Sequence, residues 1–142
     1  MPTPYSESTV ITTTARAVAP FALTYGIYVV LHGADSPGGG FQGGVIAASV
    51  FVMMAFAFGI RPTREWIDAR ALTALVAGGV LVFAGVLVST MALGGNALEL
   101  PVLPTAVKWS VELVEISIGA IVTGVVTGLF FLASVGPRGE EE

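Results

Sequence analysis

"ALTALVAGGVLVFAGVLVSTMAL", residues 71–93, contains no charged side chain and is apolar along nearly its whole length. A transmembrane α-helix needs ~20 consecutive, predominantly apolar residues to cross the hydrocarbon core of a bilayer. The stretch meets that requirement, so it predicts a membrane-spanning helix. The fold class of the chain then depends on how many further stretches of this kind it holds.

The composition favours a membrane protein. The chain has 142 residues, of which 54% are hydrophobic and 11% charged, and its mean hydropathy is +0.86. A soluble domain carries ~25% charged residues, so this chain lacks the polar surface to cover itself in water. The formal net charge of −4 excludes a basic nucleic-acid-binding surface. With no cysteine and a single histidine, we expect no disulfide, no metal site and no cofactor.

Further apolar runs predict additional membrane helices. We expect the spans at about residues 15–33, 42–60, 71–93 and 107–135, flanked by a polar N-terminal tail (1–14) and an acidic C-terminal tail (136–142). Residues 1–14 lack the positive charges, apolar core and cleavage site of a signal peptide. The alternating pattern of a membrane β-barrel is absent. The sequence therefore predicts an all-α integral membrane protein, with residues 1–142 as a single membrane domain of four transmembrane helices.

The basic residues predict how these helices are oriented. With four spans, both termini and the loop at residues 61–70 share one side of the membrane. The other side carries only Lys108, whereas the shared side carries the arginines Arg16, Arg61, Arg64, Arg70 and Arg138. The positive-inside rule therefore predicts that both termini are cytoplasmic and that the loop after the first span faces outward.

The loop after the first span is unusually rich in glycine, with the sequence "HGADSPGGGFQGG" from His32 to Gly44. A phosphate-binding loop requires Lys-Ser/Thr after its last glycine, whereas Val45 and Ile46 follow here, so no nucleotide is expected. A close-packed turn explains the glycines, which permit positive φ and close approach of backbones. It does not explain the polar residues around the turn, which are His32, Asp35, Ser36 and Gln42.

The stretch from Tyr25 to Ser49, "YGIYVVLHGADSPGGGFQGGVIAAS", resembles the signature of the B subunit of Mrp-type multisubunit Na+/H+ antiporters, the MnhB/MrpB family. The resemblance extends over the whole chain in size, number of spans and an acidic residue in the last span. The sequence departs from the signature at Ala34-Asp35, where the family leads us to expect His-Asn or a similar pair. The signature loop comprises His32, Pro37, Gly38, Gly39, Gly40, Phe41, Gln42, Gly43 and Gly44.

The resemblance implies a function as well as a fold. It implies a small membrane subunit of a cation/proton antiporter in the plasma membrane of a prokaryote. Its implied partners are the other subunits of that complex, both large subunits that resemble pumping subunits of respiratory complex I and small membrane subunits. Related subunits occur in membrane-bound hydrogenase and sulfane-reductase complexes, so a structural subunit of a redox-driven complex is the alternative. Neither implies an enzyme.

Two acidic residues lie within the last predicted span. Lys108, Glu112 and Glu115 follow one another at intervals of four and three residues, which places them on one face of a helix. An acid inside a membrane span is costly and by default suggests a functional site. Glu115 and Glu112 are therefore candidates for an ion path, in which a carboxyl group exchanges a proton or holds a cation.

Both acids also have a purely structural interpretation. Glu112 could pair with Lys108 at the membrane surface, and Glu115 could bind a partner subunit as an anchor. No combination of nucleophile and base accompanies the acids, so we expect no catalytic site.

The first span carries a further set of candidates on one helix face, Tyr25, Tyr28 and His32. Aromatic residues near a membrane surface commonly form an interfacial belt. The alternative is a polar lining shared with the Glu115 face, where His32, which titrates near neutral pH when unperturbed, would relay protons. A histidine bonded to a loop carbonyl is the other possibility.

Small residues in the last span favour close helix packing. Gly124 and Gly128 form a GxxxG motif, which Ser117 and Ala120 continue toward the start of the span. Their number in so small a protein suggests neighbours beyond this chain.

Overall fold

The computed structural model describes residues 8–103 and 106–135. The expected acidic tail at 136–142, Arg138 and residues 1–7 of the expected N-terminal tail lie outside the described residues. Four helices are long and apolar enough to cross a membrane, which confirms the predicted all-α membrane fold. They are α1 (Thr9–Leu31), α2 (Gly40–Phe58), α4 (Ala69–Ala92) and α5 (Val107–Ser134), and the short α3 (Ile60–Trp66) and η1 (Leu100–Val102) lie between them.

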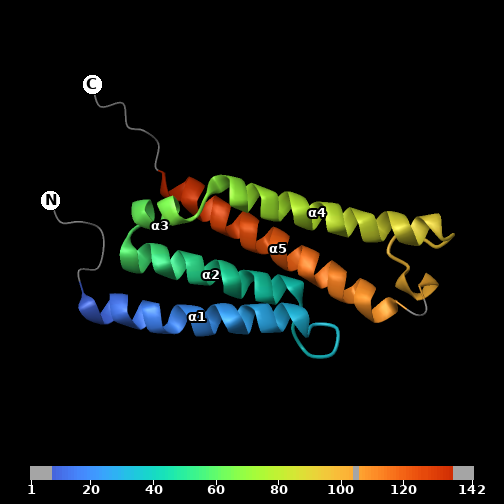
Figure 1. The fold of residues 1–142 in the computed structure, drawn as a ribbon, viewed down its shortest axis with the longest axis horizontal. Coiled ribbons are helices and arrows are strands. Elements are labelled where there is room, and N and C mark those ends of the chain that lie inside the picture. Colours follow the sequence, from blue (N-terminus) through green and yellow to red (C-terminus); the bar gives the residue numbers. More distant parts are fainter. Residues whose placement is uncertain (1–7, 104–105, 136–142) are drawn as a thin grey trace, which may run out of the picture.

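The long helices form a row in the order α1, α2, α5, α4 (Figure 1). α5 therefore lies between α2 and α4, although it is last in the chain. One end of the row carries the loop after α1, η1 and the start of α5, and we call it the loop end. The opposite end carries α3, the start of α1 and the end of α5, and we call it the α3 end (Figure 1). Which end faces the cytoplasm stays a prediction.

The glycine-rich stretch divides between a turn and a helix. Residues 32–39 form the turn, and α2 begins at Gly40, so Gly40–Gly44 are its first residues. Gly38 and Gly39 have φ angles of +152° and +146°, a conformation that a side chain would strain. At the other end of α2, Gly59 has a φ of +104° and separates α2 from α3.

The first helix is longer at its N-terminal end than the expected span. α1 begins at Thr9, ahead of residue 15, and Pro20 lies inside it. Its last residue, Leu31, precedes the turn at residues 32–39.

Small residues make up most of the buried core of the row. The buried apolar side chains include Ala47, Ala48, Ala55 and Ala57 on α2. A Cβ on Gly44 would lie 2.8 Å from the backbone oxygen of Gly119, so α2 and α5 approach closely at this point. Lipid tails are as apolar as the helices, so helix association in a bilayer depends on van der Waals packing. Close approach of the backbones increases that packing. Many large apolar residues remain exposed on the outside of the row, as expected for surfaces that meet lipid or other subunits.

Candidate functional site

Glu115 lies beneath the turn that follows α1. A Cβ on Gly33 would overlap the Glu115 carboxyl group, and one on Gly39 would lie 3.6 Å from Glu115 Oε1. A Cβ on Gly40 would overlap the Glu115 backbone oxygen. The carboxyl group and its backbone therefore occupy space that the missing side chains of these glycines leave free. We call Gly33, Gly39, Gly40 and Glu115 the glycine–acid site.

The Glu115 carboxyl group is half-buried, and one of its oxygens is not satisfied within the described part of the chain. Oε2 is buried from solvent and has no hydrogen-bond partner among the described residues. The backbone of Ala34 lies near the carboxyl group, and Glu112 is near enough to interact with it electrostatically. Buried polar atoms are normally hydrogen-bonded, so this oxygen is the atom of the site that is open to contact from outside the described residues.

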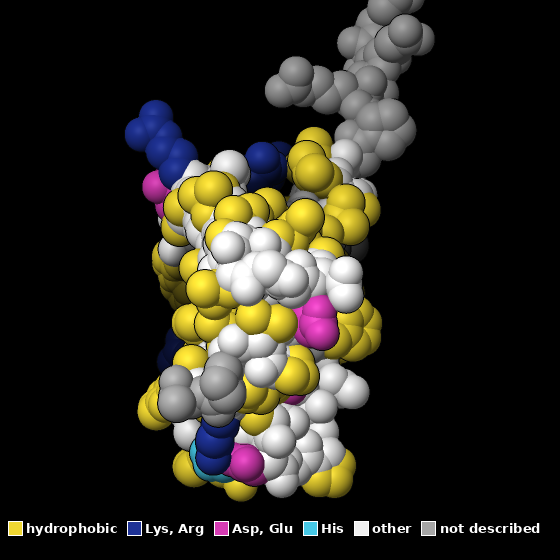
Figure 2. Space-filling model, turned by 90° about the vertical axis from the view of Figure 1, so that its right-hand side faces the viewer, with side chains coloured by type: hydrophobic (Ala, Val, Ile, Leu, Met, Phe, Trp, Pro, Cys, Tyr) yellow, Lys and Arg dark blue, Asp and Glu magenta, His cyan; other side chains and the backbone are white. Residues whose placement is uncertain are grey.

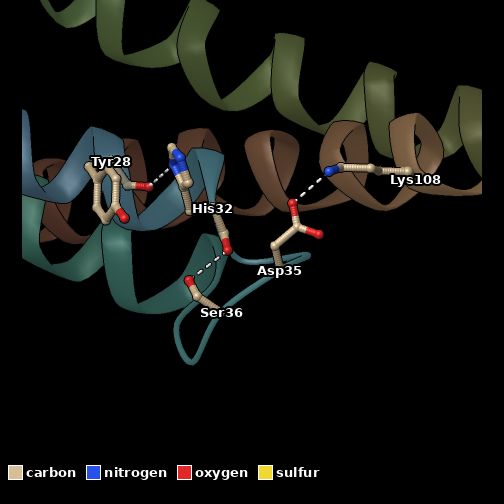
Figure 3. Close-up of polar contacts among 5 residues, drawn as sticks. All are labelled: Tyr28, His32, Asp35, Ser36 and Lys108. Atoms are coloured by element: carbon tan, nitrogen blue, oxygen red, sulfur yellow. Dashed lines mark hydrogen bonds and ion pairs between the residues drawn. The ribbon is translucent and has the colours of Figure 1, made fainter.

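Lys108 pairs with the loop and not with its helical neighbour Glu112. Its Nζ lies 2.6 Å from Asp35 Oδ2, with the two side chains 67% and 60% exposed (Figure 3). The pair therefore connects the turn after α1 to the first turn of α5. Figure 2, which faces the loop end, shows a local group of basic, acidic and histidine side chains on a largely uncharged surface. Exposed pairs of this kind contribute ~0–1 kcal/mol and are weakened by salt.

The structure does not bring the aromatic face of α1 to Glu115. Gly26 and Val30 of α1, and Gly33 in the turn that follows it, face α2 and α5. Tyr25 lies roughly a third of a turn, and Tyr28 nearly half a turn, around the helix from this inward face, and they are 59% and 52% exposed. This face points out of the four-helix row, toward lipid or another subunit.

His32 belongs to the same outward face. Its ring stacks on Tyr28 with 4.1 Å between ring centroids, and its Nδ1 donates to the Tyr28 carbonyl oxygen at 3.2 Å (Figure 3). Ser36 Oγ in turn donates to the His32 carbonyl oxygen at 2.7 Å. His32 is thus bonded within its own helix, and these contacts fix the beginning of the turn.

A family model described as "Domain related to MnhB subunit of Na+/H+ antiporter" matches residues 10–128. The chain belongs to the MnhB family. A protein of Staphylococcus aureus (strain Newman) named "Putative antiporter subunit mnhB2" is 32% identical over 136 residues, which cover 89% of this chain and 94% of the relative. A protein of the same name from Staphylococcus haemolyticus is 33% identical over 72 residues, or 51% of each chain.

The MnhB signature loop serves more than one purpose in this chain. Gly43 and Gly44 bring α2 against α1 and α5, whereas Gly39 and Gly40 contact Glu115. Phe41 is 61% exposed, and Gln42 and Pro37 are exposed as well. The part of the signature that faces inward is therefore glycine, and the larger side chains face outward.

Sequence reasoning missed Gly33 as part of the site. A glycine directly after the predicted end of a span suggests a helix end, not a contact with a residue 82 positions further along the chain, since 115 − 33 = 82. The sequence indicated that an acid within a span needs surrounding protein, but it could not identify Gly33 as the residue that contacts it.

Proposed function

We propose that this chain is a small membrane subunit of a multisubunit Na+/H+ antiporter and that Glu115 forms part of its ion path. Membership of the MnhB family and the names of the relatives support the first part. A plasma-membrane location in a prokaryote, with large complex-I-like subunits and small membrane subunits as partners, belongs to the same proposal. The relatives reported above carry antiporter names, so no observation favours the alternative of a redox-driven complex.

The observation that carries the proposed role of Glu115 is its position against the glycines. The carboxyl group lies between α5 and the turn after α1, on the protein side of the helix, with an oxygen that lacks a partner among the described residues. An ionisable side chain within a membrane span is costly and rare. A residue that served only to fill this space would not need to be acidic.

The geometry suggests how the site would work. An ionised Glu115 offers a negative oxygen to a cation, and a protonated Glu115 is neutral and releases it. Glu112 lies one helical turn closer to the loop end and interacts with Glu115 electrostatically, so it would raise the local cation concentration on that side. His32, Tyr25 and Tyr28 lie outside this path in the isolated chain and would enter it only through a neighbouring subunit.

The test replaces the Glu115 carboxyl group with an amide of the same shape. Glu115→Gln in the complete antiporter complex should abolish Na+-dependent proton movement in everted membrane vesicles, and native gels should show an assembled complex. Glu65→Gln, which alters an exposed acid at the α3 end, is the matched control and should change neither. Wild-type antiport by an assembled Glu115→Gln complex would show that Glu115 is a structural anchor.

A further inference from the structure

A second feature of the fold lies at the α3 end, far from Glu115. Here α4 and α5 leave a groove of about 420 Å³ between them, lined on both helices by small and apolar side chains. Among the lining residues are Ala69, Leu72, Val76, Gly124, Gly128 and Phe131. Arg64 of α3 lines the same groove and is its one charged lining residue.

The two glycines of the GxxxG motif differ in what they contact. A Cβ on Gly124 would lie 2.5 Å from Val76 Cγ2, so this glycine is already used to pack α5 against α4. A Cβ on Gly128 would meet nothing within 4 Å. The groove therefore remains open beside Gly128, and the chain itself does not fill it.

Arg64 is available for a ligand. Within residues 8–103 and 106–135, an ion pair shorter than 4.0 Å joins Lys108 and Asp35 at the other end of the molecule. Arg64 forms no ion pair with these residues. By contrast, Arg16, also near the α3 end, lies 5.1 Å from the centre of the Phe58 ring. Arg61 and Arg70 are exposed in the same part of the chain, as are the acids Glu65 and Asp68, so residues 61–70 carry three arginines against two acids. A guanidinium group presents donors in a planar fork that matches the oxygens of a phosphate.

We propose that this groove binds an anionic phospholipid, with the phosphate on Arg64 and an acyl chain along α4 and α5 past Gly128. Basic pockets between transmembrane helices are suited to anionic headgroups, and the apolar lining is suited to hydrocarbon. A helix of another subunit fits less well. Close helix packing on a GxxxG motif uses both glycines, and Val76 already covers Gly124.

The test uses the assembled complex in membranes that contain phosphatidylglycerol with a photoreactive group on its acyl chain. After illumination, mass spectrometry of peptides from α4 and α5 should find the lipid attached around Gly128. Phosphatidylcholine with the same photoreactive group should label these peptides about fivefold less. Arg64→Gln should lower phosphatidylglycerol labelling by about fivefold, which corresponds to ~1 kcal/mol for one arginine at a membrane surface.

A pair of glycine variants distinguishes the effect of filling the groove from the general effect of introducing a leucine into a transmembrane helix. Gly128→Leu should remove the labelling because the new side chain occupies the groove. Gly85→Leu is the matched control on α4, since a Cβ there also meets nothing within 4 Å. Equal labelling by both lipids, or full labelling of Arg64→Gln, would overturn the proposal even if Gly128→Leu failed to assemble. Crosslinking of a partner subunit by a benzophenone introduced at position 128 would overturn it as well.

Discussion

Gly40→Ala should prevent the antiporter complex from assembling normally, because the new methyl group has no room between two helix backbones. Its Cβ would overlap the Glu115 carbonyl oxygen and lie 2.9 Å from the Glu115 carbonyl carbon and 3.0 Å from Ile118 Cβ. These atoms belong to the backbone and to a branched Cβ, so no side-chain rotation relieves the contact. Carbon atoms pack best at ~3.5–4.0 Å, so α2 would have to move away from α5 by on the order of 1 Å.

The expected cost follows from the kind of contact. An inserted methyl group in a closely packed core costs ~1–3 kcal/mol. Alanine is the better helix former by ~1 kcal/mol inside a helix, but Gly40 is the first residue of α2, where that gain is smallest. The net effect should destabilise the contact between α2 and α5.

The measurement is the amount and thermal stability of the complex. The Gly40→Ala complex should be less abundant on native gels and should dissociate at a lower temperature than the wild type. Gly85→Ala, where the new Cβ meets open space, should leave both quantities unchanged or slightly improved. A Gly40→Ala complex with wild-type abundance and dissociation temperature would refute the packing of α2 against α5 described above.

Further tests address other parts of the site. Gly33→Ala should leave assembly intact but reduce antiport, because its methyl group displaces only the flexible end of Glu115; unchanged antiport would contradict a role for that carboxyl position. Asp35→Asn should lower stability by at most ~1 kcal/mol, with the difference from wild type disappearing in high salt, as measured by thermal dissociation; a larger, salt-independent loss would show a different role. A cysteine at Ser36 should react with an impermeant reagent from outside the cell and one at Glu65 should not; the opposite pattern would reverse the predicted orientation.

The number and nature of the spans could be predicted because they depend on local composition. Residues 71–93 lack charge altogether, and an uncharged apolar stretch of this length predicts a transmembrane helix. The expected span at 42–60 already included Gly43 and Gly44, and α2 begins two residues earlier, at Gly40, although glycine disfavours helix and "GGGFQGG" favours a loop. In the structure Gly43 and Gly44 are helical and bring α2 against α1 and α5. This tertiary packing outweighs the preference of glycine for a loop.

The partners of the charged residues could not be predicted from spacing alone. Glu112 lies four residues from Lys108 on the same helix, which made it the local candidate for an ion pair. The structure instead brings Asp35 to Lys108 through the turn after α1. Periodicity likewise placed Tyr25, Tyr28 and His32 on one face of α1 but could not say which way that face points. Both outcomes depend on how α1 sits in the row, which is a property of the whole fold.

The glycines and the acid have a common physical explanation. Ordinary side chains at the positions of these glycines would overlap Glu115 and hold the neighbouring backbones away from it. Glycine at positions 33 and 40 lets the backbones of the turn after α1 and of the start of α2 come into contact with Glu115. The acid is then half-buried near the loop end, and its buried Oε2 has no hydrogen-bond partner among the described residues. Such an oxygen can accept a proton, a cation or a donor group of a neighbouring subunit, and antiport by an assembled Glu115→Gln complex distinguishes an ion path from an anchor.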